Sequence, residues 1–230
     1  MVSQSATSSL DSLVSSLQQT LDNKAWKGKI LLTTSFSHED QLLTWAVMES
    51  GLSVEMVSLD TGLLFPATLQ TWKETEAHFE VSIRSLVPDK SEVDSFNQKR
   101  GLSSIYQDVG ARKSCCSMRK IVPLKQACQG MEWWLTGLRK SHSENRAGMT
   151  AVEPAPEWGV QKFHPLLDWT DAQISAAVKW TGVPVNPLYK MGYSSIGCAP
   201  CTRPVLPGES PRAGRWWWEQ SAKECGLHRG

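Results

Sequence analysis

Four cysteines in two groups are the residues of this chain best suited to chemistry. Cys115 and Cys116 are adjacent, and Cys198 and Cys201 form a C-x-x-C pair around Pro200. Four thiolates suit either a tetrahedral zinc ion or an iron–sulfur cluster. Side chains of successive residues diverge, so an adjacent pair fits two corners of a 4Fe-4S cube better than one small ion. We therefore predict one 4Fe-4S cluster per chain, with zinc and a redox disulfide pair as the alternatives.

Another thiol, Cys225, lies near the end of the 230-residue chain, with His228 three positions further on. Taken alone, Cys225 is either an incidental exposed thiol or a nucleophile, because a thiolate attacks sulfur well and nearby cations lower a thiol pKa. Its terminal position would let it move. The remaining cysteine, Cys128, lies on an apolar helical face and is predicted to serve packing alone.

Cations gather beside the cysteines, the expected strand ends and the C-terminus, in a chain whose net charge is only +1. They are Arg112, Lys113, Arg119, Lys120, Arg139, Lys140, Arg146, Arg203, Arg212 and Arg215. Such residues usually form a solvated surface, but this clustering favours a small polyanion such as a phosphosulfate. The near-neutral total charge gives no general attraction to nucleic acid or to an anionic membrane.

Alternating apolar strands and helices must position these residues. The expected strands cover 29–35, 54–59, 81–87 and 131–136, and the expected helices cover 10–21, 42–51, 66–79 and a stretch beginning at Thr170. This order predicts an α/β fold with a doubly wound, mainly parallel sheet. Ligands bind at the carboxyl ends of such strands. The loops 35–37 and 60–62 should therefore face one pocket, with a plain helix cap and a plain turn as the alternatives.

Three segments are expected along the chain. Residues 1–28 are predicted to form an N-terminal helix with a disordered start, 29–207 a nucleotide- and cluster-binding α/β domain, and 208–230 a mobile catalytic tail. The N-terminus lacks the features of a secretory signal, and no apolar run approaches the roughly 18–20 residues that span a bilayer. We therefore expect a cytoplasmic protein with reduced thiols and no membrane partner.

Several motifs together resemble a known family. They are Cys115-Cys116-x-x-Arg119-Lys120, Gly197-Cys198-x-Pro200-Cys201-Thr202-Arg203-Pro204, Gly214-Arg215-Trp216-Trp217-Trp218-Glu219 and Glu224-Cys225-Gly226-Leu227-His228. From about Lys29 to its end, the chain resembles the assimilatory adenylyl-sulfate (APS) reductases, the iron–sulfur branch of the phosphoadenylyl-sulfate (PAPS) reductase family.

The resemblance implies an adenine nucleotide alpha-hydrolase-like fold and a thioredoxin-dependent oxidoreductase of sulfate assimilation and cysteine biosynthesis. Cys225 would attack the sulfur of APS and release AMP, and thioredoxin or a similar dithiol protein would free sulfite from the resulting S-sulfocysteine. Cys115, Cys116, Cys198 and Cys201 would hold the 4Fe-4S cluster. The implied substrate-binding residues are Ser35, Phe36, Ser37, Leu59, Thr61, Gly62, Lys120, Arg139, Arg146, Arg212, Arg215 and His228.

The sequence departs from the family pattern at Leu63-Leu64, where many relatives have an Arg-Leu pair. The loop from Ser35 to His38 also lacks the paired glycines of ATP-hydrolysing relatives. A PAPS reductase or a dual APS/PAPS reductase is the first alternative, although relatives restricted to PAPS usually lack the four cluster cysteines. A tRNA-thiolating enzyme with a pyrophosphate loop and a zinc-thiolate binding module are further alternatives. A homo-oligomer is compatible with the sequence.

Overall fold

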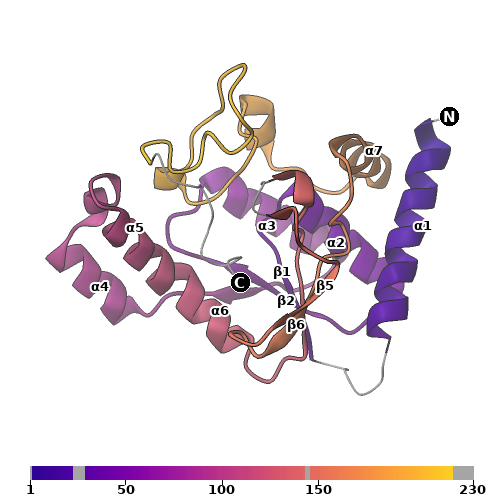
Figure 1. The fold of residues 1–230 in the computed structure, drawn as a ribbon, viewed down its shortest axis with the longest axis horizontal. Coiled ribbons are helices and arrows are strands. Elements are labelled where there is room, and N and C mark those ends of the chain that lie inside the picture. Colours follow the sequence, from indigo (N-terminus) through magenta and orange to yellow (C-terminus); the bar gives the residue numbers. More distant parts are fainter. Residues whose placement is uncertain (1, 23–28, 143–145, 220–230) are drawn as a thin grey trace.

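A mostly parallel six-stranded sheet forms the centre of the computed structural model, which describes residues 2–22, 29–142 and 146–219 (Figure 1). The strands are β1 (Ile30–Thr33), β2 (Glu55–Leu59), β3 (Arg84–Leu86), β4 (Trp133–Leu135), β5 (Val152–Ala155) and β6 (Val160–Phe163). They lie in the order β3-β2-β1-β4-β6-β5, and β5 is antiparallel to β6 while the other pairs are parallel. The doubly wound α/β fold predicted from the sequence is thus confirmed.

Seven α-helices surround this sheet in the described part of the chain. They are α1 (Val2–Leu21), α2 (His38–Ser50), α3 (Pro66–Phe79), α4 (Lys90–Lys99), α5 (Val109–Cys116), α6 (Val122–Ala127) and α7 (Asp171–Thr181). The first helix begins at Val2 rather than near Leu10, because Ala6 continues the buried stripe of Leu10 and Leu13 by another turn. Helix α7 begins where the sequence predicted a helix, after a capping box formed by Thr170 and Gln173.

Helices cover both faces of the sheet because its inner strands are apolar on both sides. Ile30 and Leu32 of β1 pack in a cluster that includes residues of α1, α2 and α7. The intervening Leu31 points to the other face and packs with Leu124 of α6 and with Trp134 of β4. Figure 1 shows α1 beside α2 and α7, with α4, α5 and α6 at the opposite end of the molecule.

Helix α1 packs along the body of the protein through α2 and α7. Its buried residues Leu10, Leu13, Leu17 and Leu21 recur at helical spacing, as the sequence predicted. None of the helices within the described ranges is long and apolar enough to cross a membrane.

Candidate active site

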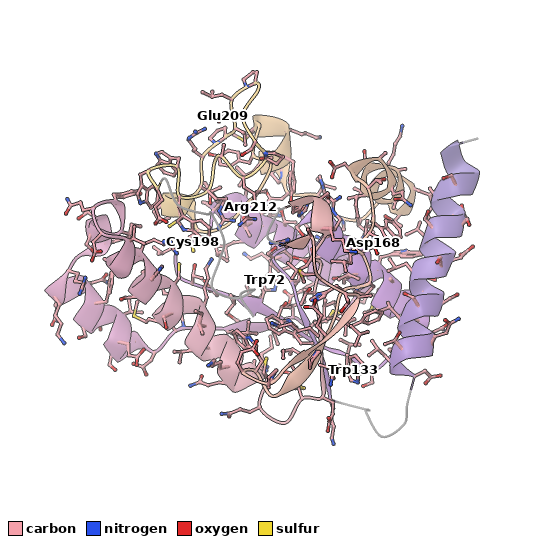
Figure 2. All side chains as sticks on the ribbon, viewed as in Figure 1. Trp72, Trp133, Asp168, Cys198, Glu209 and Arg212 are labelled. Carbon is pink, nitrogen blue, oxygen red and sulfur yellow. The ribbon has the colours of Figure 1, made fainter. Side chains whose placement is uncertain are left out.

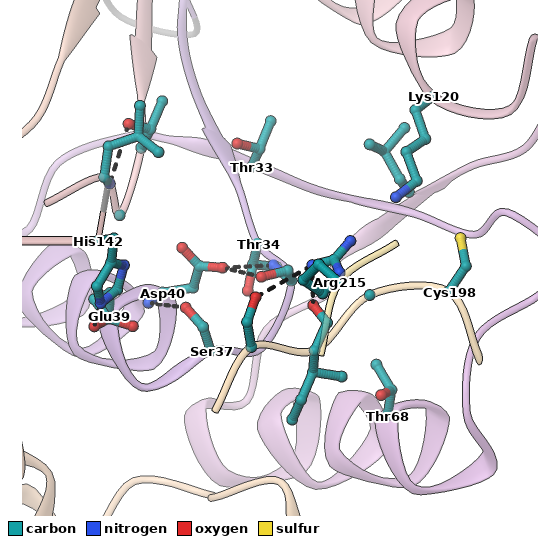
Figure 3. A pocket seen from close by; sticks show the side chains of 18 of the residues that line it. Thr33, Thr34, Ser37, Glu39, Asp40, Thr68, Lys120, His142, Cys198 and Arg215 are labelled. Carbon is teal, nitrogen blue, oxygen red and sulfur yellow. Dashed lines mark hydrogen bonds and ion pairs between the residues drawn. The ribbon is translucent and has the colours of Figure 1, made fainter. Parts of the chain in front are cut away.

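A cavity of about 260 Å³ opens at the carboxyl ends of β1, β2 and β4 (Figure 3). Its lining includes Ser35 and Ser37 after β1, Thr61 after β2, and Thr136 after β4. The strand order reverses between β1 and β4, since chain connections run outward in both directions from this pair. Such a reversal leaves a crevice where open α/β sheets bind their ligands. The two loops expected from the sequence to share one pocket, 35–37 and 60–62, do meet here through Ser35, Ser37 and Thr61.

The loop after β1 is held in shape by hydrogen bonds to its own side chains. The backbone N–H and the hydroxyl of Ser35 both donate to Asp40 Oδ2 at 2.7 Å, and Ser37 Oγ accepts from the Asp40 N–H at the start of α2. Burial raises the pKa of the Asp40 carboxyl, and the Ser35 hydrogen bonds act in the opposite direction. Phe36 has a left-handed backbone (φ 61°), and its ring packs against Trp72. Phe36 therefore anchors the loop instead of lining the cavity.

Cationic and apolar side chains both line the cavity. The cations are Lys120, Arg146, Arg212 and Arg215, and the apolar residues include Val57, Leu59, Leu124 and Trp134. Arg215 passes so close to Gly197 that a Cβ there would overlap its guanidinium group. The Trp134 indole is fixed by an N–H donated to Thr33 Oγ1 at 2.8 Å. A ligand with an aromatic base and an anionic group matches this combination of side chains.

Arg139 is placed differently from the other predicted cations. Its side chain is only 3% exposed and donates to Glu39 Oε1 at 2.8 Å and to the Trp169 carbonyl at 2.9 Å. It also pairs with Asp171, and it does not belong to the cavity lining. Glu39 itself does line the cavity, so Arg139 fixes a wall residue. Gly62 likewise stays outside the lining, in the left-handed turn after β2 (φ 69°).

The other predicted substrate-binding residues fall into two groups. Ser35, Ser37, Leu59, Thr61, Lys120, Arg146, Arg212 and Arg215 all line the cavity. The predicted nucleophile Cys225 and the predicted ligand contact His228 lie outside the described residues.

A second, smaller cavity is lined by all four cysteines of the two sequence motifs, none of which forms a disulfide. Cys115, Cys198 and Cys201 are buried, and Cys116 is half-buried. Lys120, Cys198 and Arg215 line both cavities, so the two spaces share a wall. Figure 2 shows Cys198 and Arg212 on the C-terminal loops beside the helical end of the molecule, and Figure 3 shows Lys120 and Cys198 together at one side of the larger cavity.

The four thiols form a soft donor set of the kind that binds iron or zinc. Burial raises the pKa of the Cys201 thiol to about 12 and also raises that of Cys115. Burial acts the same way on Cys198, but Lys120, the Thr61 hydroxyl and Arg215 outweigh it and lower the pKa of that thiol. In the described ranges, no group of three or more His, Cys, Asp or Glu side chains is arranged to hold a metal ion.

A π-helical segment, η3 (Ser117–Ile121), connects the adjacent cysteines to α6. Its wider turn presents Arg119 and Lys120 from one short stretch, a use for which such segments are often retained at functional sites. Arg119 Nη1 donates to the Thr61 carbonyl at 2.6 Å, while Lys120 reaches the wall between the cavities. This π-helical segment could not be predicted from the sequence, because its residues are compatible with an ordinary α-helix.

The flagged pair Leu63-Leu64 is divided between the two cavities. Leu63 lines the cysteine cavity and Leu64 lines the larger one. The guanidinium of buried Arg119 already lies on this turn, 3.6 Å from the position that a Cβ on Gly62 would take. The structure thus supplies a cation to the same turn from another part of the chain.

Sequence reasoning missed several wall residues that come from poorly patterned loops. Tyr189 lines the cavity, and its ring stacks on His38 with the ring centres 3.9 Å apart. Ser194, Ser195 and Ile196 line the same cavity, and Arg215 donates to the Ser195 hydroxyl at 3.3 Å. The Ser-Ser-Ile-Gly run just before Cys198 was the available signal, since small residues permit close approach.

Buried His164, directly after β6, should make stability depend on pH. Thr136 Oγ1 lies 2.6 Å from its Nδ1, and burial lowers the imidazole pKa to about 4. Between pH 6.5 and 4 the unfolded chain then binds one more proton than the native protein. The contribution of His164 to the free energy of unfolding is therefore fully present above pH 6.5 and falls as the pH drops toward 4. We expect this histidine to remove about 3 kcal/mol of unfolding free energy by pH 4. Urea unfolding of the wild type and of His164→Asn from pH 7 to 4 checks this. If the unfolding free energy falls with pH equally steeply in both proteins, the prediction is contradicted.

Comparison with known proteins shows the family to which this nucleotide-binding α/β fold belongs. The profile of the phosphoadenosine phosphosulfate reductase domain matches residues 29–204. Adenosine 5'-phosphosulfate reductase of Agrobacterium fabrum is 45% identical over 202 residues, covering 87% of this chain and 78% of the relative. The Rhizobium meliloti protein of the same name is 44% identical, covering 88% and 77%. The chain belongs to the phosphoadenosine phosphosulfate reductase family.

Solved structures of similar fold support the architecture alone. Phosphoadenylyl-sulfate (PAPS) reductase from Candida auris, solved as a phosphate complex, superposes with a TM-score of 0.66 at 24% identity, covering 83% of this chain and 96% of that one. FMN adenylyltransferase from Candida glabrata, solved with FAD and pyrophosphate, gives a TM-score of 0.61 at 15% identity, covering 100% and 78%.

Proposed function

We propose that this protein is an APS reductase, which converts adenylyl sulfate to sulfite and AMP in sulfate assimilation. The observation that carries the proposal is the wall shared by the cation-lined cavity and the four-cysteine cavity. Relatives at 44–45% identity carry the name adenosine 5'-phosphosulfate reductase over most of this chain. An anionic sulfur substrate on an adenylate suits a cavity with both cations and an aromatic wall.

The reaction proceeds through the Cys225 thiolate in two steps. In the first, its sulfur attacks the sulfur of APS, so that an S–S bond forms, the S–O bond to the phosphate breaks and AMP leaves with the electron pair. In the second, a thiolate of a dithiol protein such as thioredoxin attacks Cys225, and sulfite leaves with its electron pair. The second thiol of the donor then frees Cys225. The donor dithiol becomes a disulfide and so supplies both electrons.

The lining cations hold the substrate in this scheme. Lys120, Arg146, Arg212 and Arg215 bind the phosphosulfate, and His228 lies beside it, while Ser35, Ser37, Leu59 and Thr61 bind the nucleotide. Arg139, Phe36 and Gly62 act indirectly by holding Glu39 and the two loops in place. Charge-assisted hydrogen bonds from several guanidinium groups also stabilise negative charge as AMP leaves.

We propose that the four cysteine thiols hold a 4Fe-4S cluster, one per chain, because all four line the same small cavity. They converge on one largely buried cavity, and Lys120 and Arg215 on its wall compensate the negative charge of thiolate ligands. When bound, the cluster would supply a fixed local charge and would pass no electrons to the product. Lys120 holds its ammonium group between the two sites, where it favours both the Cys198 thiolate and an anionic substrate.

Reduction of PAPS is the second candidate function, because the matching domain family is named for phosphoadenosine phosphosulfate. A side-by-side assay of APS and PAPS separates an APS enzyme from a dual one. We also propose that the reaction takes place in the cytoplasm, where dithiol proteins are kept reduced. We further propose that residues 29–207 form the nucleotide- and cluster-binding domain and that 208–230 form the catalytic tail, while α1 occupies most of the segment 1–28.

Mass spectrometry after incubation with APS and no reductant tests the proposed function. A mass increase of one sulfite group on Cys225 is expected, and added thioredoxin should release it as sulfite. Cys225→Ser should form no adduct and no sulfite while keeping its iron. Cys128→Ala is the matched thiol control, because Cys128 is buried in the apolar cluster with Leu31 and Trp134 and should not affect the adduct. Turnover by Cys225→Ser at the parent rate would overturn the assignment.

A further inference from the structure

We propose that Arg112 is a positioning residue that fixes the start of the C-terminal segment against the cysteine cavity, through Glu219 and Trp216. This inference rests on the proposed function, since it concerns how the Cys225 thiolate is delivered to the substrate. Neither residue of the ion pair lines the larger cavity, so their effect on the reaction would be indirect.

Arg112 and Glu219 form a bidentate ion pair away from solvent. Arg112 Nε donates to Glu219 Oε1 and Nη2 donates to Oε2, each at 2.8 Å. The two side chains are 7% and 2% exposed. Two parallel charge-assisted hydrogen bonds fix relative orientation as well as distance. A buried pair of this geometry loses much when one partner is removed, because the other charge is then left unpaired.

Trp216 links this ion pair to the substrate cavity. The guanidinium carbons of Arg112 and Arg215 each lie 4.8 Å from the centre of the Trp216 ring. Trp216 is 1% exposed and has a left-handed backbone (φ 41°), and its backbone N–H donates to the Cys201 carbonyl. A bulky residue keeps such a backbone only where its surroundings impose it. Arg112 therefore helps to set Trp216, and with it Arg215 on the wall of both cavities.

Arg112 also faces the cysteine cavity directly. Its side chain belongs to the cavity lining, and its position is set by α5, which begins after the Asp108 cap. One guanidinium group thus lines the cysteine cavity and also holds the segment that leads to Cys225.

The anchor at Glu219 limits where Cys225 can go. Cys225 follows Glu219 by six residues, and an extended chain of that length spans at most about 20 Å. A fixed starting point within that distance of the cavity raises the effective concentration of the thiolate at the substrate. Releasing Glu219 moves the fixed point back along the chain and lowers that concentration, while the thiol itself is unchanged.

The matched test compares Glu219→Gln with Glu209→Gln. Glu209 also makes a bidentate pair at 2.8 Å, with Arg203, in the same part of the chain, but that pair is about 30% exposed and lies apart from both cavities. In single-turnover reactions with saturating APS, we expect Glu219→Gln to form the Cys225 adduct about tenfold more slowly and Glu209→Gln to keep the parent rate. Alkylation of Cys225 by iodoacetamide should proceed at the parent rate in both variants.

A readout independent of activity separates positioning from general damage. Trypsin should cut after Lys223 faster in Glu219→Gln than in wild type, while iron content stays the same. Glu219→Asp keeps the charge and should recover part of the lost rate, which covers the case that the amide variant folds poorly. Equal adduct rates in wild type and Glu219→Gln would overturn this inference alone. Absence of any adduct in the wild type would instead overturn the proposed function.

Discussion

Replacing Cys198 with serine is expected to remove the bound iron and to abolish sulfite formation. Cys198 is buried, and it alone of the four cysteines lines both cavities. A serine hydroxyl is a harder and far less acidic ligand than a thiol, so it does not replace a thiolate on iron. Loss of this proposed ligand would also remove the thiol whose pKa Lys120 lowers. Iron and acid-labile sulfide analysis, the visible absorbance and the rate of sulfite release measure the outcome.

Cys128→Ser is the control for this substitution, because it makes the same chemical change at another buried thiol. Cys128 is 1% exposed and packs with Leu31 and Trp134, and burial raises its thiol pKa to about 11. We expect Cys128→Ser to keep its iron and to lose only about 1–3 kcal/mol of unfolding free energy, the cost of burying a hydroxyl in an apolar cluster. Full iron content in Cys198→Ser would contradict the proposed ligand set.

The parts of the sheet that were predicted from the sequence are those where one physical signal dominates. The run 29–35 contains β1, and the run 131–136 contains β4. Each has three consecutive buried apolar residues at its centre, 30–32 and 133–135, which is the pattern of a strand covered on both faces. The β5–β6 hairpin was missed. Its strands are four residues each and include Pro154 and charged residues, so their pattern does not differ from that of a polar loop. The hairpin joins the sheet through the pairing of β6 with β4, and this pairing cannot be read from the local sequence.

The position of the site followed from topology, but the partners of individual cations did not. Loops after β1 and β2 were expected to meet because the carboxyl ends of parallel strands share an edge. Nothing local distinguishes Arg139, which pairs with Glu39, from Arg215, which lines the cavity. The two residues of the Arg139–Glu39 pair are a hundred positions apart in the sequence. Tertiary contacts therefore decide which cations pair with carboxylates inside the protein and which line the cavity.

Replacing Lys120 with alanine is expected to slow formation of the Cys225 adduct by about a hundredfold or more. The ammonium group lies on the wall between the cysteine cavity and the substrate cavity, carried there by the π-helical segment after Cys116. Like Arg215, it lines both cavities and lowers the pKa of the Cys198 thiol. A preorganised positive charge beside a developing anion contributes about 3 kcal/mol to such reactions. Single-turnover mass spectrometry at saturating APS measures the step directly.

Lys125→Ala supplies the matched control, because Lys125 belongs to α6 only one turn further along the chain. Its ammonium lies over Trp158, 5.8 Å from the ring centre, and it lines neither cavity. The control should react at the parent rate. This result would exclude the explanation that removing any cation from this part of the chain slows adduct formation. Lys120→Arg keeps the charge but places a wider, planar group in the shared wall, and it should recover only part of the rate. A Lys120→Ala protein with full iron content and an unchanged adduct rate would show that the charge between the two cavities has no role in the reaction.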